Sequence, residues 1–279
     1  MKRMYDEPLS KHTTFRIGGP AEVLSIPESE EELIREIKHV QGRDIDYKIL
    51  GRGSNLLISD SGINGVVIKN TSACTNIERE GNLVSVGSSV SLQKFIKFCV
   101  NNNLEGKEYL FSVPATVGGA IYMNAGRGKK HNLSISDNLI SVKIFDGTKV
   151  RRLKKEQCDF GFRQSVFHRH DDWIILEGEF ELDDQPKEIG ERKIKERKEK
   201  VKDWFIYKYP SAGSVFKRRS FLAKRLLNRI KIGDAKLEGN FICNLGTASF
   251  NDVLWLINLS KMLSYLTFKK PELEIEIWE

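Results

Sequence analysis

Two glycine-rich segments constrain the fold of this chain more than any other feature of its sequence. Leu50-Gly-Arg-Gly-Ser-Asn-Leu56 lies between two apolar segments, and Pro114-Ala-Thr-Val-Gly-Gly-Ala-Ile-Tyr-Met-Asn-Ala-Gly126 combines a proline, a glycine pair and an Asn-Ala-Gly step. Glycine lets the backbone approach a ligand closely and leaves backbone amides free to bind it. Neither segment is a Walker loop or a dinucleotide-binding Gly-x-Gly-x-x-Gly loop. Each alone could be an ordinary turn, but together they indicate an extended phosphate-bearing cofactor that is bound from two sides.

The residues around the first segment predict a compact α/β lobe over 1–69. An apolar run at 22–26 is typical of a strand, and Ser29 and Glu32 have the spacing of a capping box at the start of a helix. Further strand-like runs follow at 47–50, 56–58 and 65–68. Strands and a helix in this order, joined by short connections, are typical of an α/β lobe.

Residues 70–185 are predicted to form a second lobe in which strands dominate. Asp146-Gly147 predicts a hairpin turn, and 91–102 has apolar residues at helical spacing after a serine. The strand-like runs lie at 76–79, 83–86, 140–145, 149–153 and 173–182. This lobe is therefore expected to be α+β.

The rest of the chain is predicted to be a connecting helix and a last domain. Residues 186–203 carry charges of both signs with i,i+4 pairing, which favours an exposed connecting helix over a basic nucleic-acid-binding helix. Within 204–279 we expect a glycine-rich turn at 211–214, a basic helix at 220–229, a strand at 240–244, a helix at 250–266 and a strand at 272–278. The predicted fold class of the whole chain is α+β.

Charge and cysteine content argue against several classes of protein. The 45 basic and 38 acidic residues leave a net charge of +7 that is spread along the chain, which suits anionic small molecules and does not indicate nucleic acid. The four cysteines lie far apart, so neither disulfides nor a metal site is expected. No apolar segment has the length of a signal-peptide core or of a membrane span. We therefore expect a cytoplasmic protein that binds no metal, nucleic acid or membrane and needs no obligate protein partner.

Five segments, in order along nearly the whole chain, carry a resemblance to a known family. They are Thr13-Thr-Phe-Arg-Ile-Gly-Gly-Pro-Ala21, the segment 50–56, Pro114-Ala-Thr-Val-Gly-Gly-Ala120 with Met123-Asn-Ala-Gly126, Gly161-Phe-Arg-Gln-Ser165, and Tyr209-Pro-Ser-Ala-Gly-Ser-Val-Phe-Lys217. In this combination they resemble the signatures of UDP-N-acetylenolpyruvoylglucosamine reductases, the MurB family, and the last one is similar to that of the shorter-chain type II. The resemblance implies a two-lobe FAD-binding domain of the vanillyl-alcohol-oxidase type over 1–69 and 70–185, followed by a C-terminal α+β substrate-binding domain.

The resemblance also implies an activity. In this family NADPH reduces FAD, and the enolpyruvyl ether of UDP-N-acetylglucosamine is then reduced to UDP-N-acetylmuramate, a peptidoglycan precursor. We therefore expect an FAD-dependent oxidoreductase of cell-wall synthesis, with NADPH and a UDP-sugar as its small-molecule partners. Two alternatives stay open: a related FAD-dependent reductase that acts on a different nucleotide sugar or enol ether, and a non-catalytic flavin-binding protein.

Three residues match the family's catalytic positions. The reaction develops negative charge on the substrate carboxylate and needs a proton donor at the neighbouring carbon, so it requires a fixed cation and an acid. The resemblance assigns the cation to Arg163, the proton donor to Ser214 and a carboxyl group to Glu276. Glu274 and Glu279 compete for the last role, and the register with the family favours Glu276.

The resemblance assigns FAD binding to the two glycine-rich segments and substrate binding to the last domain. The FAD residues are Gly51, Arg52, Gly53, Ser54, Asn55, Leu56, Pro114, Thr116, Gly118, Gly119, Asn124, Ala125 and Gly126. Lys217 and Arg218 are assigned to the substrate. Here the chain departs from the family pattern, because Arg218-Arg219 replaces the usual Asn-Pro and Ile275 replaces the usual proline. These departures keep a different substrate open.

Overall fold

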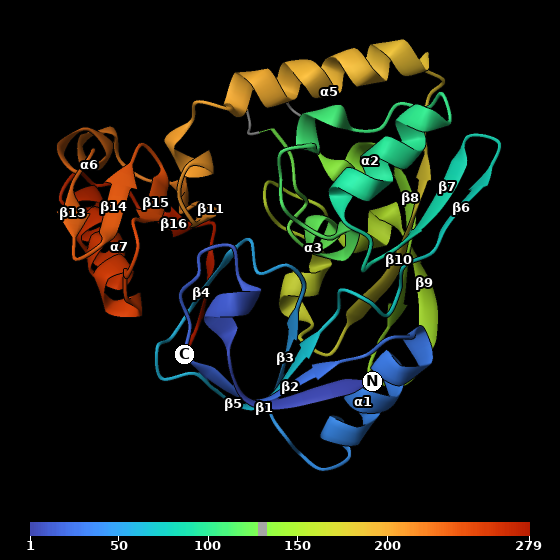
Figure 1. The fold of residues 1–279 in the computed structure, drawn as a ribbon, viewed down its shortest axis with the longest axis horizontal. Coiled ribbons are helices and arrows are strands. Elements are labelled where there is room, and N and C mark those ends of the chain that lie inside the picture. Colours follow the sequence, from blue (N-terminus) through green and yellow to red (C-terminus); the bar gives the residue numbers. More distant parts are fainter. Residues whose placement is uncertain (128–132) are drawn as a thin grey trace. The chain divides into compact units, whose positions relative to one another are not determined.

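The structure, a computed structural model, describes residues 1–127 and 133–279 (Figure 1). The described residues divide into two compact units. The first unit consists of Met1–Arg3, Ser25–Arg52 and Val66–Val201, and the second of Met4–Leu24, Gly53–Gly65 and Lys202–Glu279. Strands β1 (Lys2–Pro8), β2 (Pro20–Ile26) and β5 (Ile63–Lys69) contain residues of both units. Each unit therefore combines segments that lie far apart in the sequence.

A five-stranded antiparallel sheet forms the centre of the first unit, with the strand order β6-β7-β10-β8-β9. The strands are β6 (Ile77–Glu80), β7 (Leu83–Gly87), β8 (Leu139–Phe145), β9 (Val150–Lys154) and β10 (Ile174–Glu181). The connection between β8 and β9 turns at Gly147, whose φ of 86° favours glycine. The hairpin predicted from Asp146-Gly147 is thereby confirmed. Strand β3 (Tyr47–Leu50) pairs in parallel with β5.

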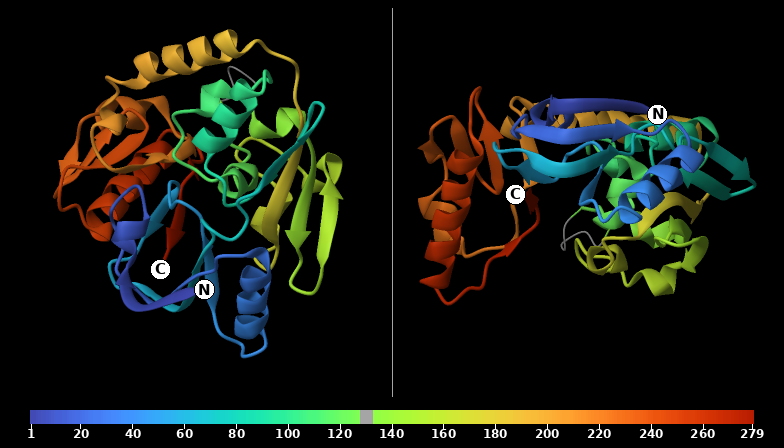
Figure 2. Two further views of the ribbon diagram at one scale, coloured as in Figure 1. Left: turned by 45° about the vertical axis from the view of Figure 1, so that its right-hand side comes forward. Right: turned by 90° about the horizontal axis from the view of Figure 1, so that it is seen from below.

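Helices α2 (Leu92–Asn101), α3 (Val117–Tyr122) and α5 (Lys187–Val201) belong to the same unit (Figures 1 and 2). Helix α3 packs on β7 and β10, and α2 contacts both α3 and α5. The rings of Phe95 and Phe180 lie 5.1 Å apart in the core between the helices and the sheet. Burial of one such side chain contributes about 1.5–3 kcal/mol to the free energy of unfolding. The interface is therefore firm enough to position the loops at the helix ends.

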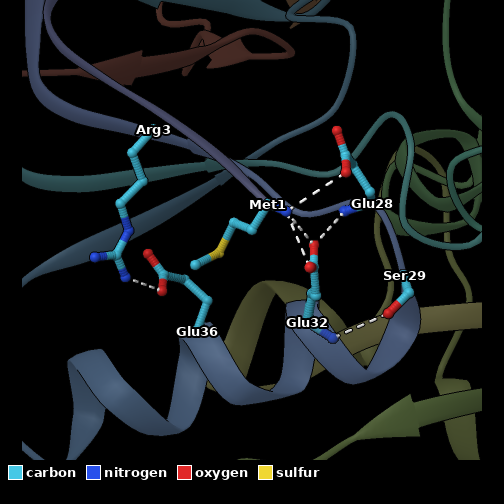
Figure 3. Close-up of polar contacts among 6 residues, drawn as sticks. All are labelled: Met1, Arg3, Glu28, Ser29, Glu32 and Glu36. Carbon is cyan, nitrogen blue, oxygen red and sulfur yellow. Dashed lines mark hydrogen bonds and ion pairs between the residues drawn. The ribbon is translucent and has the colours of Figure 1, made fainter.

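Helix α1 (Glu30–Gln41) begins at Ser29, whose hydroxyl accepts a hydrogen bond from the Glu32 amide at 3.2 Å. The Glu32 carboxylate accepts hydrogen bonds from the Glu28 amide and from the N-terminal ammonium of Met1, both at 2.9 Å (Figure 3). The predicted helix start is confirmed, but the glutamate reaches one residue beyond the position that a capping box requires. The Glu32 carboxylate thereby holds Met1 against the first turn of α1. The helix dipole favours the acidic side chains of that turn.

The second unit is built on a four-stranded sheet with the order β11-β15-β14-β13. The strands are β11 (Ser211–Ser214), β13 (Lys231–Ile232), β14 (Ala235–Glu238) and β15 (Phe241–Asn244). Helix α7 (Phe250–Tyr265) packs on β13 and β14 and contacts α6 (Phe221–Leu226). Strand β12 (Phe216–Arg218) pairs with β16 (Glu272–Leu273), and β17 (Glu276–Trp278) pairs in parallel with β4 (Leu56–Ile58). The core of this unit includes Phe15, Ile17 and Leu57.

Short 3-10 helices complete the described chain. They are η1 (Leu9–His12), η2 (Glu108–Leu110), η3 (Ile135–Asn138), η4 (Lys155–Cys158), η5 (Val166–Arg169) and η6 (Phe205–Tyr207). Most of the predicted helices and strands are confirmed, but β1, β12, β13 and β14 are not predicted by the apolar pattern.

Three predicted segments differ in the structure. Residues 117–122, predicted as part of a glycine-rich loop, form α3. Residues 211–214, predicted as a turn, form β11, and an irregular register with β15 accommodates Gly213 at a φ of 77°. The predicted strand 272–278 is interrupted by a bend at Glu274–Ile275.

All four cysteines, Cys74, Cys99, Cys158 and Cys243, are buried as free thiols. Burial raises the pKa of each thiol to about 12. Because the thiolate is the reactive form, these side chains act as small apolar core residues. The expectation that the cysteines form no disulfides agrees with these free thiols.

We predict that the native protein reacts very slowly with an aromatic disulfide reagent at neutral pH. A rise of the pKa from 9.0 to about 12 lowers the thiolate fraction about 1000-fold, and burial blocks access in addition. Absorbance of the released thiol checks this, with the same protein in denaturant as the control in which all four thiols react. Rapid reaction of any thiol in the native protein would contradict the burial of that cysteine.

Candidate functional site

A pocket of about 250 Å³ lies within the first unit, beside the first glycine-rich segment. Its lining consists of Arg52, Thr71, Thr75, Ser89, Val90, Ser91, Lys94 and Thr116. Two cations and several hydroxyl groups line it, and carboxylates are absent from this described lining. Charged and hydroxyl donors of this kind bind phosphate oxygens in proteins. The pocket is therefore suited to an anionic, phosphate-bearing ligand.

A buried hydrogen-bond network fixes one wall of the pocket. The Ser89 hydroxyl donates to Asn70 Oδ1 at 2.6 Å, and Asn70 Nδ2 donates to the Ser88 hydroxyl at 3.0 Å. Ser89 Oγ also accepts a hydrogen bond from the Cys74 amide at 3.0 Å. The Asn70 amide binds the Leu50 carbonyl at 2.8 Å, so the same residue ties the wall to the glycine-rich segment. Such networks are rigid when every member has a partner.

The second glycine-rich segment contributes Thr116 to the pocket. The Thr116 hydroxyl accepts a hydrogen bond from the Gly119 amide at 3.1 Å and caps α3. The Gly118 amide binds the Ser88 carbonyl at 2.9 Å, and a Cβ at Gly118 would lie 2.8 Å from Ser88 Cβ. The amides of the glycine pair are thus engaged within the protein, contrary to the expectation of free donors. Gly118 and Gly119 therefore serve close packing of the protein. Gly51 is in a similar position, because a Cβ there would lie 3.1 Å from Thr116 Oγ1.

Arg163 holds the end of the same segment. Its Nη1 and Nη2 atoms donate to the carbonyls of Asn124 and Gly126 at 3.3 and 2.7 Å. Asn124 Nδ2 donates to the Gly161 carbonyl at 2.9 Å. The Asn124 Oδ1 atom is buried and accepts no hydrogen bond from the described residues. Because buried polar atoms are nearly always paired, this oxygen points to a ligand that donates to it.

Asn124 and Arg163 also share an uncommon backbone conformation. Their φ angles of 42° and 55° lie in the left-handed region. Arg163 adopts it within a turn closed by hydrogen bonds between Gly161 and Gln164. For most residues other than glycine this conformation costs about 1–2 kcal/mol, so the surrounding contacts must hold Arg163 in it. Eight further described residues other than glycine share it, so the candidate site rests on the hydrogen bonds of Asn124 and Arg163.

The other resemblance segments meet in the second unit. The Thr14 hydroxyl donates to the Ser211 carbonyl at 2.8 Å, and the Thr14 amide donates to the Gly53 carbonyl at 3.2 Å. Gly53 has a φ of 60°, and a Cβ there would lie 2.8 Å from the His12 carbonyl oxygen. The requirement for glycine at this position is therefore set by the packing of the protein itself.

Ser214 on β11 and Glu276 on β17 both lie close to Ser54 and Asn55, the two residues that directly precede β4. Ser214 ends β11 beside Gly213, where an added Cβ would lie 3.8 Å from the Ser54 carbonyl oxygen. The Glu276 amide donates to the Asn55 carbonyl at 2.9 Å. Both side chains are partly buried. The structure thus brings these two predicted catalytic residues to the same short segment, whereas Arg163 belongs to the first unit.

The competing glutamates differ in their surroundings. Glu279 is exposed, and Glu274 lies at the bend between β16 and β17. The Glu274 amide donates to the Val215 carbonyl at 2.8 Å, and its carbonyl accepts from Asn55 Nδ2 at 2.9 Å. Because of the bend, strand alternation does not assign Glu274 and Glu276 to one face. The choice between them rests on the family register.

The predicted substrate residues lie on β12. Lys217 is partly buried, and Arg218 is exposed and forms an ion pair with Glu272 on β16. The neighbouring Arg219 turns inward, where it donates to Ser260 Oγ at 3.2 Å and to a carbonyl in the β14–β15 turn. Burial lowers the pKa of Arg219 to about 10, so it stays protonated at neutral pH. No role for Arg219 was expected from the sequence. The one feature that could have drawn attention to it is that Arg218-Arg219 replaces the usual Asn-Pro of the family.

This chain is similar to known proteins over nearly its whole length. Residues 21–151 match the FAD binding domain family. The UDP-N-acetylenolpyruvoylglucosamine reductase of Bacillus subtilis (strain 168) is 37% identical over 92% of this chain and 87% of its own length. That of Clostridium tetani is 38% identical over 91% and 84%, respectively. The chain belongs to the UDP-N-acetylenolpyruvoylglucosamine reductase family. A crystal structure of the family from Thermus caldophilus matches 100% of this chain and 98% of its own, with 31% identity and a TM-score of 0.80.

Family membership confirms the resemblance seen in the five segments. It also confirms the predicted fold class, an α+β protein with an FAD-binding domain of the expected type and a C-terminal α+β domain. The residues fit FAD on two observations of this structure. The pocket beside Arg52 offers cations and hydroxyls for phosphates, and the Asn124 Oδ1 atom offers a buried acceptor.

We predict that Arg52→Gln lowers the affinity for FAD about ten-fold, because a charged hydrogen bond to phosphate contributes about 1.5–3 kcal/mol. Flavin titration followed by fluorescence quenching measures this. Arg43→Gln is the matched control, since Arg43 is an exposed arginine of the same unit and is absent from the pocket lining. Equal affinity in the two variants would remove Arg52 from the FAD site.

Gly53 is a poorer target, because substitution there clashes with the His12 carbonyl whether or not FAD is bound.

Proposed function

We propose that this chain reduces the enolpyruvyl ether of UDP-N-acetylglucosamine to UDP-N-acetylmuramate, with FAD as cofactor and NADPH as reductant. The observation that carries the proposal is the relationship to reductases of this name over more than nine tenths of the chain. The retention of Arg163, Ser214 and Glu276 at the matching motif positions supports catalysis over simple flavin binding.

The FAD site proposed here comprises the pocket at Arg52 and the segment that ends at Gly126. Arg52, Lys94 and Thr116 would hold the phosphates, and Asn124 Oδ1 would accept a hydrogen bond from the ring system. When bound, FAD carries the electrons of NADPH to the enolpyruvyl group as a hydride. We propose that 1–69 and 70–185 serve as the FAD-binding lobes, that 186–203 connects them to 204–279, and that this last part binds the UDP-sugar.

Arg163 is proposed to stabilise the substrate carboxylate as negative charge develops on it. A guanidinium stays charged at every accessible pH and donates hydrogen bonds in a fixed planar array. The hydrogen bonds of Arg163 to the carbonyls of Asn124 and Gly126 hold this array in place before substrate arrives. Such preorganised charge usually makes the largest contribution to lowering a barrier of this kind.

Ser214 is proposed to donate the proton to the carbon next to the carboxylate. A serine hydroxyl is a weak acid, so this role requires a position fixed at the reacting carbon. The irregular register of β11 with β15, together with the left-handed Gly213, supports the proposal because both constrain the backbone at Ser214. Glu276 is proposed to shape the charge in the same region, because its strand begins beside Asn55. A carboxylate close to the developing charge must be protonated or bonded to a cation to avoid repulsion.

The reaction uses small, freely diffusing substrates, so we propose that the chain acts in the cytoplasm and without an obligate protein partner. NADPH oxidation by the purified protein, measured with and without UDP-N-acetylglucosamine enolpyruvate, tests the function. We expect continued NADPH oxidation and formation of UDP-N-acetylmuramate only when the sugar nucleotide is present, and oxidation limited to the amount of bound flavin when it is absent. Turnover with a different enol ether alone would favour the alternative substrate, for which the Arg218-Arg219 departure is the motivating observation.

We predict that Ser214→Ala slows product formation by more than the 10²–10⁴-fold that general acid catalysis usually contributes, because the proton has no other donor. Stopped-flow absorbance of the bound flavin should show that NADPH still reduces the protein at nearly the normal rate. Ser211→Ala is the matched control on the same strand and should leave both rates within a few fold. If Ser214→Ala slows both half-reactions equally, the serine positions the cofactor or NADPH instead.

We predict that Glu276→Gln lowers kcat on the enolpyruvyl substrate at least ten-fold with little change in substrate binding, because the amide keeps the shape but cannot titrate. Steady-state kinetics measure both parameters. Glu274→Gln is the control and should change kcat less than two-fold. Greater sensitivity at Glu274 would move the catalytic carboxyl to the bend between β16 and β17.

A further inference from the structure

Helix α6 and the end of α7, with the residues that follow it, carry a cluster of exposed apolar side chains in the second unit. Phe221 is 77% exposed, Leu266 70% and Phe268 99%. We name this cluster the α6–α7 face, and it comprises Phe221, Leu222, Leu226, Tyr265, Leu266 and Phe268. Single exposed apolar residues are normal, but a group of large ones on adjacent elements marks an interaction site.

Helix α7 has a buried side and a mixed outer side. Val253, Leu256 and Ile257 are fully buried in the core of the second unit. Trp255 and Met262 lie on the opposite side, which also carries the exposed Asn251 and Asn258. A mixed outer side is ordinary for a surface helix. The unusual apolar group is therefore the one formed by α6 and the end of α7.

Contacts between the two helices bring the apolar residues at the start of α6 beside those at the end of α7. The Ser220 amide, directly before α6, donates to Ser264 Oγ near the end of α7 at 3.2 Å. The preceding Arg219 donates to Ser260 Oγ, one turn earlier on α7. These bonds place the start of α6, with Phe221, beside the end of α7, as the two helices also lie in Figures 1 and 2.

The stretches 217–232 and 253–271 are basic and contain no acidic residue, and Asp252 and Glu272 lie directly before and after the second stretch. The stretch 217–232 carries Lys217, Arg218, Arg219, Lys224, Arg225, Arg229 and Lys231. The stretch 253–271 carries Lys261, Lys269 and Lys270. Lys224, Arg225, Lys269 and Lys270 are exposed. The apolar face is thus bordered by positive charge, which selects for an anionic partner.

We propose that the α6–α7 face binds the surface of a bilayer that contains anionic lipids. Exposed Tyr, Phe and Leu side chains with Lys and Arg beside them are typical of segments that lie in the membrane–water interface. A second copy of the chain would bring two basic faces together, and a nucleic acid would leave the leucines and phenylalanines without apolar partners. No described helix is long and apolar enough to cross a membrane, so the face lies on the bilayer. This differs from the sequence-based expectation of no membrane partner, and it does not depend on the proposed reaction.

The test is flotation of the flavin-loaded protein with two kinds of vesicle. One kind is pure phosphatidylcholine, and the other contains equal parts of phosphatidylcholine and phosphatidylglycerol. We expect flotation only with the second kind, and less of it at high salt, because screening weakens the contribution of each exposed cation. Equal flotation with both kinds, or with neither, would overturn the proposal.

Two variants separate the apolar and the charged contributions. Phe221→Ser/Leu266→Ser/Phe268→Ser removes exposed apolar groups, and Lys269→Glu/Lys270→Glu reverses two charges. Each should lower the partition coefficient at least ten-fold, since an interfacial Lys contributes about 1 kcal/mol and 1.4 kcal/mol is ten-fold. Lys195→Glu/Lys200→Glu on the exposed side of α5 and Tyr5→Ser, elsewhere in the second unit, are the matched controls and should bind as the parent does.

Circular dichroism and flavin content show whether each variant is folded, and the exposure of every changed side chain favours this. Three results would overturn the proposal. They are undiminished flotation of both face variants, equal loss in the controls, and a dimer in size-exclusion chromatography that only the apolar variant dissociates. Binding of the parent to DNA but to neither vesicle would also overturn it and would assign the basic residues to nucleic acid.

Discussion

Burial of Phe15, Ile17 and Leu57 among the C-terminal residues is the constraint on which the second unit depends. These side chains are 0–2% exposed and form one core with residues of β14, β15 and α7. Complete burial of three large apolar groups contributes several kcal/mol, comparable with the whole stability of a domain. These three residues of the N-terminal part of the chain therefore belong to the core of the second unit. The start of β4 enters the second unit with them, and this places Asn55 next to Glu276.

Local patterns predicted the elements that local interactions determine. The starts of α1 and α2 were predictable because Ser29 and Ser91 accept hydrogen bonds from the amides three residues on. Helix α3 was not, because Gly118 and Gly119 disfavour a helix in isolation. It forms because Thr116 caps it and its apolar side rests on β7 and β10. The pairing of β17 with β4 joins strands from opposite ends of the chain, and single-sequence patterns contain no signal for it.

In the candidate site, too, some residues could be predicted from the sequence and others could not. The motif positions of Arg52, Arg163 and Ser214 were found by resemblance, and the structure supplies what holds them. Asn70 fixes the pocket wall through Ser89 and Leu50, although nothing in the sequence distinguishes it from a surface asparagine. The left-handed turn of Arg163 is equally hidden, because arginine is an unusual residue there. Residues that support a site through long-range hydrogen bonds are the ones that sequence reasoning misses.

The parallel pairing of β4 with β17 has a consequence for synthesis on the ribosome. Asn55 and Glu274 are joined by a hydrogen bond across 219 residues of chain. At 5–20 residues per second, about 10–40 s pass between the emergence of one and of the other. During that interval β4 has an unpaired edge, and Phe15 and Leu57 lack their core. Nascent chains of this protein therefore expose an unpaired strand and apolar side chains until residues 272–278 have emerged, and such surfaces are prone to aggregation.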